Sequence, residues 1–451
     1  MKEYDIIVVG SGCGSIIVSE AIAHEKKVAL IDKGPVGGTC PNVGCIPSKM
    51  LIHSADRIAE AVEANWVGVT ARIEKVDFHF IMERMRKFVR ENQTHMKKEL
   101  AMAVGLDFYQ SEAHFVDEYT LEVGGEKIKA KEIFLASGSR PVIPPIKGLD
   151  TVDYLTNETL LQLKERPDSL IIIGGGYIAV EYGHFFAAMG TKVTILEMAD
   201  RLVLSEEPEV SKLLQEELEQ RMEIHTKAQV QEIKKTAAGV SVLTGSDGAH
   251  KEFTARSLLV AVGRRSNADL LKVESTGVEV DERGWIKVNE YLETNKKGIS
   301  AVGDAIGKQM FTHVANREAM LAADAAVHDT RLKMDFSAAP HAVYSHPQIA
   351  SVGMTEAAAK KEHKILVGRA SYFDVAQGEA MLEKKGFAKA IVEEETDKIL
   401  GFHIIGPYAP ILIQEVVDAI ASGKHLQAIS DGMHIHPSIS ELIPRVFAEL
   451  G

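Results

Sequence analysis

Short apolar runs and glycine-rich loops alternate at the start of the chain. Ile6 to Val9 are all apolar, as expected for a strand that is buried on both faces of a parallel sheet. The loop Gly10 to Ser15 follows, and then the segment Ile16 to His24, which has helical character. A second apolar run, Val28 to Ile31, ends at Asp32. The pattern predicts a strand, a glycine loop, a helix and a second strand.

The same plan recurs in the middle of the chain. The apolar run Leu170 to Ile173 precedes the loop Gly174 to Ala179. A predicted helix from Val180 to Met189 follows, and then a strand from Lys192 to Leu196 that ends at Glu197. Two copies of one strand, loop, helix and strand unit predict two nucleotide sites. This is an architectural duplication rather than a short-period repeat of the solenoid kind.

The last quarter of the chain has a different character. From about Asp335, short alternating strands are mixed with helices, which predicts a separate α+β domain. The predicted strands are Ala342 to Tyr344, Phe387 to Val392 and Ile399 to Ile405, and the predicted helices are Ala409 to Ser422 and Ser440 to Leu450. Earlier runs at residues 258–262 and 299–302 each precede a glycine, and the run 133–136 precedes the turn Ser137 to Ser139; all three predict further strands of the nucleotide-binding part.

Length and charge narrow the class of protein. A chain of 451 residues suggests about three domains at roughly 100–200 residues each. The formal charge is −13, which argues against a protein whose main partner is nucleic acid or an anionic membrane. Three cysteines exclude a disulfide-rich secreted scaffold. With no visible targeting segment or apolar membrane span, we expect a cytoplasmic protein.

The two glycine loops predict two dinucleotide sites. Such a loop brings backbone amides to a pyrophosphate at a helix N-terminus, and an acid about twenty residues on binds ribose hydroxyls. Asp32 lies 20 residues after Gly12, and Glu197 lies 21 residues after Gly176. Tight turns are the alternative interpretation, but two loops with matching context make it weak. Because Glu197 should repel a 2′-phosphate, we expect NAD at the second loop rather than NADP, although Arg201 is close enough in sequence to oppose this.

The segment from Gly37 to Lys49 contains two cysteines five positions apart. Cys40 and Cys45 can form a small-loop disulfide if the turn bends back, and such a bond is a candidate for redox chemistry. A helix N-terminus and Lys49 would favour a thiolate there. A metal site would need more ligands than Cys13 and His53 could add, so we expect no metal. Cys13 is best explained as a small residue beneath a cofactor.

This segment, G-G-T-C-P-N-V-G-C-I-P-S-K, resembles the signature of the class I pyridine nucleotide–disulfide oxidoreductases. The likeness extends over essentially the whole chain, including A-S-G-S-R-P at 136–141, A-V-G-D at 301–304 and H-P-S-I-S-E at 436–441. The resemblance implies that Cys45 is the sulfur nearest a flavin and Cys40 the one that exchanges with substrate. It also implies that Lys49 lies near flavin N5, paired with Glu181.

The resemblance further implies two bound cofactors, FAD at the first loop and NAD, with NADP less favoured, at the second. Tyr177 would cover the nicotinamide pocket. The expected cofactor-binding residues are Gly10, Gly12, Gly14, Asp32, Lys49, Gly138, Asp304, Gly174, Gly176, Tyr177, Glu197 and Gly263.

Thiol–disulfide exchange also needs a general base, and histidine suits that task near neutral pH. His436 and Glu441 resemble the family's base and its orienting carboxylate, whereas His434 fits a packing role. In this family the histidine reaches the disulfide of the partner subunit. A homodimer with active sites shared between subunits is therefore expected.

The expected fold is α/β, with two Rossmann-like nucleotide-binding domains and a C-terminal α+β dimerisation domain. We expect an FAD-binding domain in two parts, residues 1–145 and 265–334. An NAD-binding domain at 146–264 would be inserted between them, and a dimerisation domain would occupy 335–451.

The substrate is less sharply indicated than the family. Leu196 to Arg201 resembles dihydrolipoyl dehydrogenase, which predicts oxidation of dihydrolipoamide, free or carried by a lipoyl domain, with NAD⁺. The first loop and the segment Phe373 to Gly378 look closer to mycothione reductase, which predicts a low-molecular-weight disulfide instead. Mercuric reductase fits poorly because there is no carboxy-terminal cysteine pair. A non-enzymatic nucleotide-binding subunit would have no need for an intact set of cysteine, lysine and histidine residues.

Overall fold

The computed structural model describes residues 1–246 and 249–451. The described chain divides into two compact units. The first contains Met1–Ser48, Glu83–Val142 and Gly263–Asp335, and the second contains Lys49–Met82, Ile143–Val262 and Phe336–Gly451. The second unit holds both the expected NAD-binding residues and the C-terminal residues. The three-domain division of the sequence therefore stays a prediction.

A sheet with the strand order β3-β2-β1-β6-β5-β4, and with β16 paired to β6, forms the centre of the first unit. Its strands are β1 (Lys2–Val9), β2 (Val28–Ile31), β3 (Leu106–Tyr109), β4 (Ala113–Asp117), β5 (Thr120–Val123), β6 (Glu126–Leu135) and β16 (Ile299–Ala301). β1 runs parallel to β2 and β6, whereas β4 and β5 are antiparallel. All four residues of β2 are buried, as a continuous apolar run predicts for a parallel strand.

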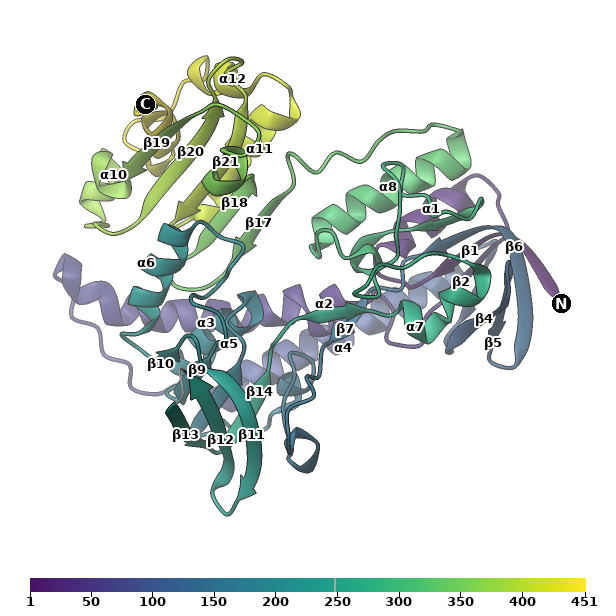
Figure 1. Ribbon diagram of the computed structural model, residues 1–451, viewed down its shortest axis with the longest axis horizontal. Coiled ribbons are helices and arrows are strands. Elements are labelled where there is room, and N and C mark those ends of the chain that lie inside the picture. Colours follow the sequence, from purple (N-terminus) through teal and green to yellow (C-terminus); the bar gives the residue numbers. More distant parts are fainter. Residues whose placement is uncertain (247–248) are drawn as a thin grey trace. The chain divides into compact units, whose positions relative to one another are not determined.

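Helices α1 (Gly14–Ala23) and α8 (Thr312–His328) lie side by side against this sheet (Figure 1). The remaining elements of the unit are short: α2 (Thr39–Val43), β7 (Ser139–Pro141), β15 (Arg264–Ser266), α7 (Ala268–Leu271), η4 (Val273–Thr276) and η5 (Gly303–Ile306). Two longer helices, α3 (Cys45–Glu63) and α4 (Phe78–Met102), have residues in both units.

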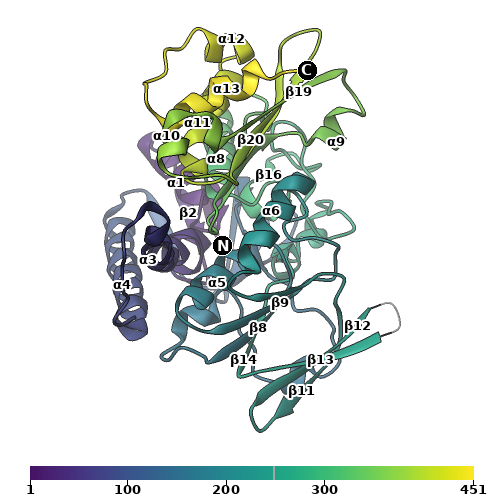
Figure 2. The same cartoon turned by 90° about the vertical axis from the view of Figure 1, so that its left-hand side faces the viewer.

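The second unit contains a parallel sheet with the order β10-β9-β8-β14. Its strands are β8 (Ser169–Ile173), β9 (Lys192–Leu196), β10 (Glu223–His225) and β14 (Ser257–Val260). In sequence, helix α5 (Tyr177–Ala188) connects β8 to β9, and helix α6 (Pro208–Leu218) lies between β9 and β10. The antiparallel strands β11 (Gln229–Thr236), β12 (Gly239–Ser246) and β13 (Ala249–Ala255) form a separate ribbon (Figure 2). Short 3₁₀ turns, η1 (Ala64–Val67), η2 (Leu149–Thr151) and η3 (Thr159–Gln162), complete this part.

The C-terminal residues form an antiparallel sheet in the order β17-β18-β21-β20-β19. Its strands are β17 (Pro340–Val343), β18 (Ile349–Gly353), β19 (Ile365–Ser371), β20 (Phe387–Glu393) and β21 (Ile399–Ile405). The helices of this part are α9 (Glu356–Ala359), η6 (Tyr372–Asp374), α10 (Ala376–Ala380), α11 (Ala409–Ala421), α12 (His425–Ser430), η7 (Ile439–Glu441) and α13 (Leu442–Ala448).

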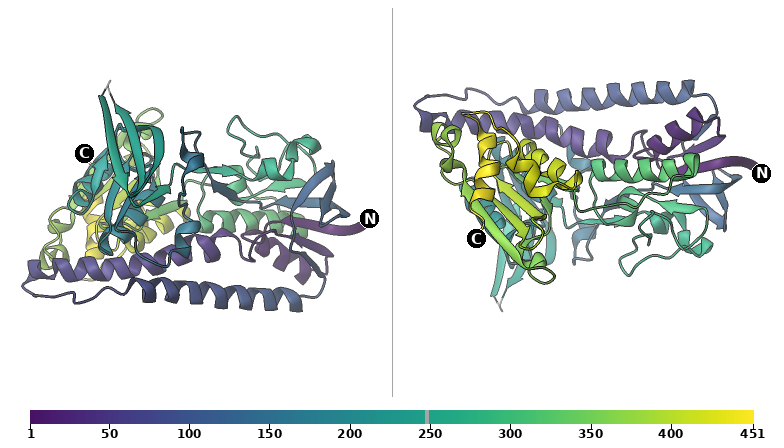
Figure 3. Two further views of the ribbon diagram at one scale, coloured as in Figure 1. Left: turned by 90° about the horizontal axis from the view of Figure 1, so that it is seen from below. Right: turned by 90° about the horizontal axis from the view of Figure 1, so that it is seen from above.

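Alternation along the strands decides what covers each face of the C-terminal sheet. Ala388, Ala390 and Val392 pack in one core with residues of α11 and α13, which cover that face (Figure 3). Lys389, on the opposite face of β20, is buried and its ammonium contacts Glu207, Glu209 and Glu356 at 2.6–2.8 Å. The apolar face therefore builds the core, and the polar face binds carboxylates.

Most predicted elements agree with the structure to within a few residues. β2, β9 and β21 have the predicted bounds, whereas the last predicted helix, Ser440 to Leu450, begins as the 3₁₀ turn η7 and continues as α13. The reason is a capping box at this turn. The Ser438 side chain accepts a hydrogen bond from the N–H of Ser440, and the Glu441 side chain accepts one from the N–H of Ser438.

Candidate functional site

The first glycine loop lies between β1 and the N-terminus of α1. Gly10 has φ +107°, and a Cβ there would lie 2.0 Å from the carbonyl oxygen of Ala136, so only glycine fits. A Cβ on Gly14 would lie 2.7 Å from Val8, which shows how closely helix and strand pack. At Gly12 the nearest atom would be 3.8 Å away, so this part of the loop is open. The loop therefore presents backbone at a helix N-terminus, as phosphate binding requires.

Asp32 follows β2 and is held by the first loop itself. Its Oδ2 accepts hydrogen bonds from the backbone N–H of Ser11 at 2.8 Å and from the Ser11 hydroxyl at 2.5 Å. Its Oδ1 accepts from the N–H of Gly34 at 2.8 Å. The acid that the sequence assigns to a ribose is thus fixed in position next to the loop, through a serine that the sequence reasoning did not single out.

The two other motifs of the first unit meet at one place. Ser139, next to Gly138, donates a hydrogen bond to Asp304 Oδ2 at 2.6 Å and accepts one from Arg264 Nε at 2.7 Å. Gly263 precedes that arginine and accepts a hydrogen bond from the N–H of Val142 at 2.9 Å. Gly138, Asp304 and Gly263 are therefore brought together, although they lie far apart in sequence.

Three buried polar atoms of this unit, Ser137 Oγ, Gln309 Oε1 and Glu318 Oε1, have no hydrogen-bond partner among the described residues. Glu318 lies on α8, and its other oxygen accepts from the N–H of Gly303 at 2.5 Å. Burial raises the pKa of Glu318 to about 7. Burial likewise raises the pKa of the Cys13 thiol to about 12, so it stays protonated. An open glycine loop and orphaned polar atoms in one unit fit a large polar cofactor such as FAD.

The cysteine pair occupies a junction between two helices. Cys40 lies in α2 and Cys45 is the first residue of α3, with Gly44 between the helices. A Cβ on Gly44 would lie 2.9 Å from the carbonyl oxygen of Thr39, so the absent side chain permits the turn. The structure shows both residues as thiols. A hydrogen bond with the Cys45 thiol, and then burial, raises the pKa of Cys40, and Cys45 Sγ lies 3.5 Å from the Thr312 hydroxyl.

Asn42, which the sequence reasoning did not single out, holds the cysteine segment in shape. Its Nδ2 donates to the carbonyl oxygens of Val36 at 2.8 Å and Gly38 at 2.7 Å. Its Oδ1 accepts from Gln93 Nε2 at 2.8 Å. A polar residue in a loop carries no sequence signal of such a role, because its partners are identified only once the loop is folded.

Lys49 and Glu181 form a close ion pair in the second unit. Lys49 Nζ lies 2.7 Å from Glu181 Oε2, and the glutamate side chain is only 8 % exposed. Glu181 Oε1 accepts from the N–H of Tyr344 at 2.9 Å, and the Lys49 ammonium lies 4.6 Å from the centre of the Tyr344 ring. The carboxylate and the aromatic ring therefore fix the ammonium in one orientation. The sequence pattern placed Tyr344 only at the end of a predicted strand, Ala342 to Tyr344.

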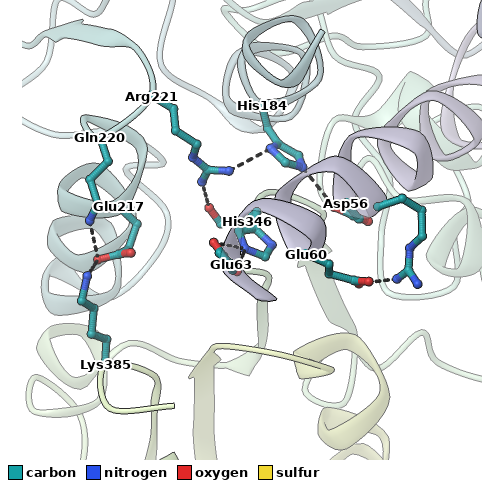
Figure 4. Close-up of polar contacts among 10 residues, drawn as sticks. Asp56, Glu60, Glu63, His184, Glu217, Gln220, Arg221, His346 and Lys385 are labelled. Atoms are coloured by element: carbon teal, nitrogen blue, oxygen red, sulfur yellow. Dashed lines mark hydrogen bonds and ion pairs between the residues drawn. The ribbon is translucent and has the colours of Figure 1, made fainter. Parts of the chain in front are cut away.

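A second polar link joins the same two helices, α3 and α5 (Figure 4). His184 Nε2 lies 3.0 Å from Asp56 Oδ1, and Arg221 donates to His184 Nδ1 at 3.3 Å. The His346 ring stacks on His184 with the centroids 5.8 Å apart, and His346 Nε2 lies 2.8 Å from Glu63 Oε1. Arg221 also donates to the carbonyl oxygen of His346. Burial lowers the pKa of His184 despite the opposing effect of Asp56, so the ring is neutral and donates to the carboxylate.

The second glycine loop repeats the geometry of the first. Gly174 has φ +109°, and a Cβ there would lie 2.4 Å from the carbonyl oxygen of Ala261. Nothing would lie within 4 Å of a Cβ on Gly176, so the loop is open at the same position. Glu197 follows β9, and its Oε1 accepts from the N–H of Ala199 at 2.6 Å. Gly175 has no side chain to contact the acid, unlike Ser11 in the first loop.

Tyr177, the first residue of α5, is anchored by a buried glutamate. Its hydroxyl donates to Glu206 Oε1 at 2.8 Å, and its ring stacks on His341 with the centroids 5.6 Å apart. His341 Nε2 lies 2.7 Å from the same oxygen, and Ser351 donates to Glu206 Oε2 at 2.6 Å. Burial alone would raise the pKa of Glu206, but hydrogen bonds led by His341 outweigh it and lower the pKa. Burial raises the pKa of Tyr177.

His436 and Glu441 form the predicted kind of base and orienting pair. His436 Nδ1 lies 2.9 Å from Glu441 Oε1, and Glu441 Oε2 accepts from the N–H of Ser438 at 3.0 Å. The Ser438 N–H, and then His436, hold the pKa of Glu441 below its usual value. The histidine side chain is 72 % exposed, so Nε2 is available to a substrate. His434 instead contacts Glu415 of α11 at 2.7 Å.

Two family models match the chain in succession. The model described as pyridine nucleotide-disulphide oxidoreductase matches residues 4–319. The dimerisation domain of the same family matches residues 339–446. The chain belongs to the pyridine nucleotide-disulphide oxidoreductase family.

Relatives in this oxidoreductase family carry several different names. Mycothione reductase of Mycobacterium tuberculosis is 34 % identical over 458 residues, which cover 98 % of each chain. Dihydrolipoyl dehydrogenase of Bacillus subtilis is 35 % identical over 450 residues, covering 98 % of this chain and 95 % of the relative. Mercuric reductase of Staphylococcus aureus is 32 % identical over 443 residues, covering 97 % and 81 %.

The fold matches solved structures closely. The Cu(II) complex of the HOCl-induced flavoprotein disulfide reductase RclA from Escherichia coli superimposes with a TM-score of 0.87. The match covers 99 % of both chains at 29 % identity. The α/β fold with nucleotide-binding and dimerisation parts, predicted from the sequence, is confirmed.

Family membership confirms the broad functional prediction. The protein is an enzyme of the flavoprotein disulfide oxidoreductase family, whose members depend on FAD and exchange electrons with NAD(P). Its dimerisation domain indicates a homodimer. Among the described residues, no helix combines the length and apolarity that a membrane crossing needs.

Proposed function

We propose that this enzyme moves two electrons between NAD(H) and an external dithiol or disulfide through the Cys40–Cys45 pair. The observation that carries the proposal is the junction of α2 and α3, where the two thiols are hydrogen-bonded to each other. Thiols in such contact can close to a disulfide and reopen without large backbone movement. The assignment of Cys45 to the flavin side and Cys40 to the substrate side rests on the family resemblance.

In the direction of dithiol oxidation, a substrate thiolate attacks Cys40 Sγ of the closed disulfide. The Cys40–Cys45 bond breaks, and Cys45 leaves as a thiolate. The second substrate thiolate then attacks the substrate sulfur of the mixed disulfide, which releases Cys40 and the substrate disulfide. The overall reaction converts a dithiol and NAD⁺ into a disulfide, NADH and one proton.

Deprotonation of the exchanging thiol requires a base. Because the pKa of Cys40 is raised, this thiol ionises only when a base accepts its proton. His436 of the partner subunit would supply that base, with Glu441 of the same chain fixing the ring through Nδ1. Glu441 also stabilises the imidazolium that forms when His436 takes up a proton.

The first glycine loop, with Asp32, Gly138 and Asp304, would hold FAD. Bound FAD supplies a two-electron carrier between the dithiol and the nicotinamide. Lys49 would hold positive charge beside it, and Glu181 and Tyr344 keep that ammonium oriented. Gly174, Gly176 and Tyr177 would receive the nicotinamide dinucleotide, with Glu197 on the adenosine ribose.

Dihydrolipoamide is our proposed dithiol, and NAD⁺ our proposed acceptor. Glu197 supports NAD because its carboxylate would repel a 2′-phosphate. The similarity to the B. subtilis dihydrolipoyl dehydrogenase supports the substrate class. A low-molecular-weight disulfide is the second candidate, favoured by the likeness to mycothione reductase over 98 % of both chains.

Anaerobic steady-state turnover of the FAD-loaded protein tests the substrate. Lipoamide is compared with a panel of low-molecular-weight disulfides, each with NADH and NADPH, and dihydrolipoamide is tested with NAD⁺. Fast lipoamide reduction with NADH, and reverse NAD⁺ reduction, would support the proposal. Slow lipoamide turnover beside efficient reduction of a thiol-cofactor disulfide would replace it with the second candidate.

The three cysteines provide a matched control. Cys40→Ser and Cys45→Ser should each lower disulfide turnover by roughly a thousandfold or more while FAD stays bound. Cys13→Ser should keep most of the turnover, because that thiol is buried and protonated. Full turnover in either of the first two variants would refute the redox-active pair.

Subunit complementation tests the shared site. Dimers of Cys45→Ser and dimers of His436→Gln are both expected to be inactive. If each active site takes its base from the second chain, mixed dimers contain one site with both substitutions and one intact site, so activity returns. If each site is built within one chain, every site in a mixed dimer is defective and no activity returns.

A further inference from the structure

Two histidines and a glutamate gather at the ends of α1 and α8, away from the motifs assigned above. Glu20 and His24 are one helical turn apart at the end of α1, and His328 is the last residue of α8. His328 Nε2 lies 2.8 Å from Glu20 Oε1, and His24 Nδ1 lies 3.4 Å from the same oxygen. One donor atom from each residue lies within 4.8 Å of the other two.

These spacings suit a metal ion. Zinc binds imidazole nitrogen and carboxylate oxygen at about 2.0–2.2 Å, so tetrahedral donor atoms lie about 3.4 Å apart. The two imidazole rings are nearly perpendicular, at 89°, with their centroids 4.6 Å apart. The side chains of the three residues are 37–43 % exposed, which leaves room for water as a fourth ligand.

The donor set also indicates which ion would bind. Two neutral imidazoles and one carboxylate suit borderline divalent transition ions, whereas Mg²⁺ and Ca²⁺ prefer oxygen donors alone. Before binding, His24 Nδ1 also lies 3.0 Å from the carbonyl oxygen of Glu20, so the ring donates a proton there. A metal ion would take the place of that proton.

We propose that Glu20, His24 and His328 form a binding site for one divalent transition-metal ion of the Zn²⁺ class, separate from the thiol chemistry. The ion would link the C-terminal ends of α1 and α8. The N-terminal ends of both helices lie at the candidate functional site. α1 begins at the first glycine loop, and Thr312, which contacts Cys45, begins α8. Metal binding should therefore stabilise the first unit.

Zinc titration of the untagged, full-length, FAD-loaded protein tests the proposal, with the thiols blocked by N-ethylmaleimide so that they cannot bind metal. Competition with a chromophoric zinc indicator should reveal one site in the wild type. His328→Gln and His24→Gln should each weaken that site by about tenfold or more. Co²⁺ at the same site should give the visible absorption of a four-coordinate ion. Zn²⁺ should raise the melting temperature of the wild type but not that of His328→Gln or His24→Gln.

A second histidine–glutamate pair provides the control. His95 Nε2 lies 3.1 Å from Glu99 Oε1 on α4, with the same four-residue spacing. Among the described residues this pair belongs to no cluster of three donors. His95→Gln should therefore bind zinc like the wild type. Equal zinc binding by wild type and His328→Gln, or a loss in His95→Gln as large as in His328→Gln, would overturn the proposed site.

Discussion

The two glycine loops share one backbone geometry but differ in how each treats its acid. Gly10 and Gly174 have φ values of +107° and +109°, and each faces a carbonyl oxygen at the end of a neighbouring strand. In the first loop Ser11 binds Asp32 through both its N–H and its hydroxyl. In the second, glycine stands at the serine position and Glu197 is bound by Ala199 instead. The two loops thus share a backbone geometry suited to phosphate binding. The residue after the first glycine, Ser11 in the first loop and Gly175 in the second, distinguishes them.

Two buried glutamates, Glu318 in the first unit and Glu206 in the second, differ in how many of their carboxylate oxygens accept hydrogen bonds. Glu318 has one oxygen without a partner among the described residues, and burial raises its pKa to about 7. Glu206 is as buried but accepts hydrogen bonds on both oxygens, and its pKa is lowered. Satisfaction of the carboxylate, rather than burial alone, decides which protonation state the fold stabilises.

The largest expected effect on cofactor binding comes from adding a methyl group at the first glycine of either loop. Gly10→Ala and Gly174→Ala each place a Cβ within 2.4 Å of a backbone oxygen at positive φ, at a cost of about 3 kcal/mol or more. Gly10→Ala should abolish FAD retention, whereas Gly174→Ala should keep FAD and lose reduction by NADH. Flavin content and anaerobic flavin bleaching distinguish the two.

Gly12→Ala and Gly176→Ala are the controls, because a Cβ at these positions meets nothing closer than 3.8 Å. Both proteins should fold with near-native melting temperatures and lose only the cofactor that their own loop binds. Identical behaviour of Gly10→Ala and Gly174→Ala would show that the two loops do not serve separate cofactors.

The second effect concerns pH and the two buried acids. Glu318 binds its proton more tightly in the folded state, so the wild type loses stability as pH rises from about 4.5 to about 7. At about 1.4 kcal/mol per pKa unit the loss amounts to about 3 kcal/mol. Glu318→Gln should remove this loss, so that its stability relative to wild type improves between pH 5 and pH 8 in chemical denaturation.

Glu206→Gln should behave in the opposite way. The folded pKa of Glu206 is lowered, so its ionised form stabilises the protein above the unfolded pKa and that contribution disappears as pH falls below about 4.5. The variant should be less stable than wild type at neutral pH, with the difference shrinking in acid. A parallel pH dependence for both glutamine variants would contradict the contrast between the acids.

A smaller effect is expected on nucleotide choice. Glu197→Gln removes the charge that would oppose a 2′-phosphate, and it should raise the NADPH to NADH ratio of kcat/KM by about tenfold. Asp200→Asn, an exposed carboxylate three residues away, should leave the ratio near that of the wild type. An unchanged ratio in Glu197→Gln would remove Glu197 from the nucleotide site.

The smallest effect tests the side chain that distinguishes the loops. Ser11→Gly gives the first loop the residue of the second, and it removes one hydrogen bond to Asp32 at a cost of about 1 kcal/mol. FAD should dissociate a few times faster, as measured by flavin fluorescence. Ser19→Ala removes only an exposed hydrogen bond within α1 and should not change the rate.

The sequence predicts those features of the structure that depend on residues close together along the chain, and it misses those that depend on distant residues. Glycine spacing, apolar runs and terminal acids predict both loops, and β2 and β9 have the predicted bounds. Glu206 escapes prediction because its partners Tyr177, His341 and Ser351 are distant in sequence. Asn42 escapes it because one partner, Gln93, is distant and the others are backbone carbonyl groups, which carry no sequence signal. His184 lies in a helix that is apolar nearly all round, where a single polar residue has no distinguishing pattern.

The cysteine signature identifies a family, but its own geometry is not local either. The cysteine segment is held by Asn42, which accepts a hydrogen bond from Gln93, and Gln93 belongs to α4, a helix that the apolar pattern did not predict. The order of strands in each sheet is likewise decided by pairing between distant segments. Resemblance supplied what local pattern could not, and it left the substrate open because relatives with different names are about equally similar.

The polar contacts of α3 have a consequence for the length of that helix. Lys49, Asp56 and Glu63, which contact Glu181, His184 and His346, recur at intervals of seven residues. Seven residues make nearly two whole turns, so the three side chains keep one angular phase around the axis. One inserted residue would rotate everything beyond it by about 100° and detach the later contacts. Changes in the length of α3 that keep these side chains on one face must therefore add or remove close to a whole number of helical turns.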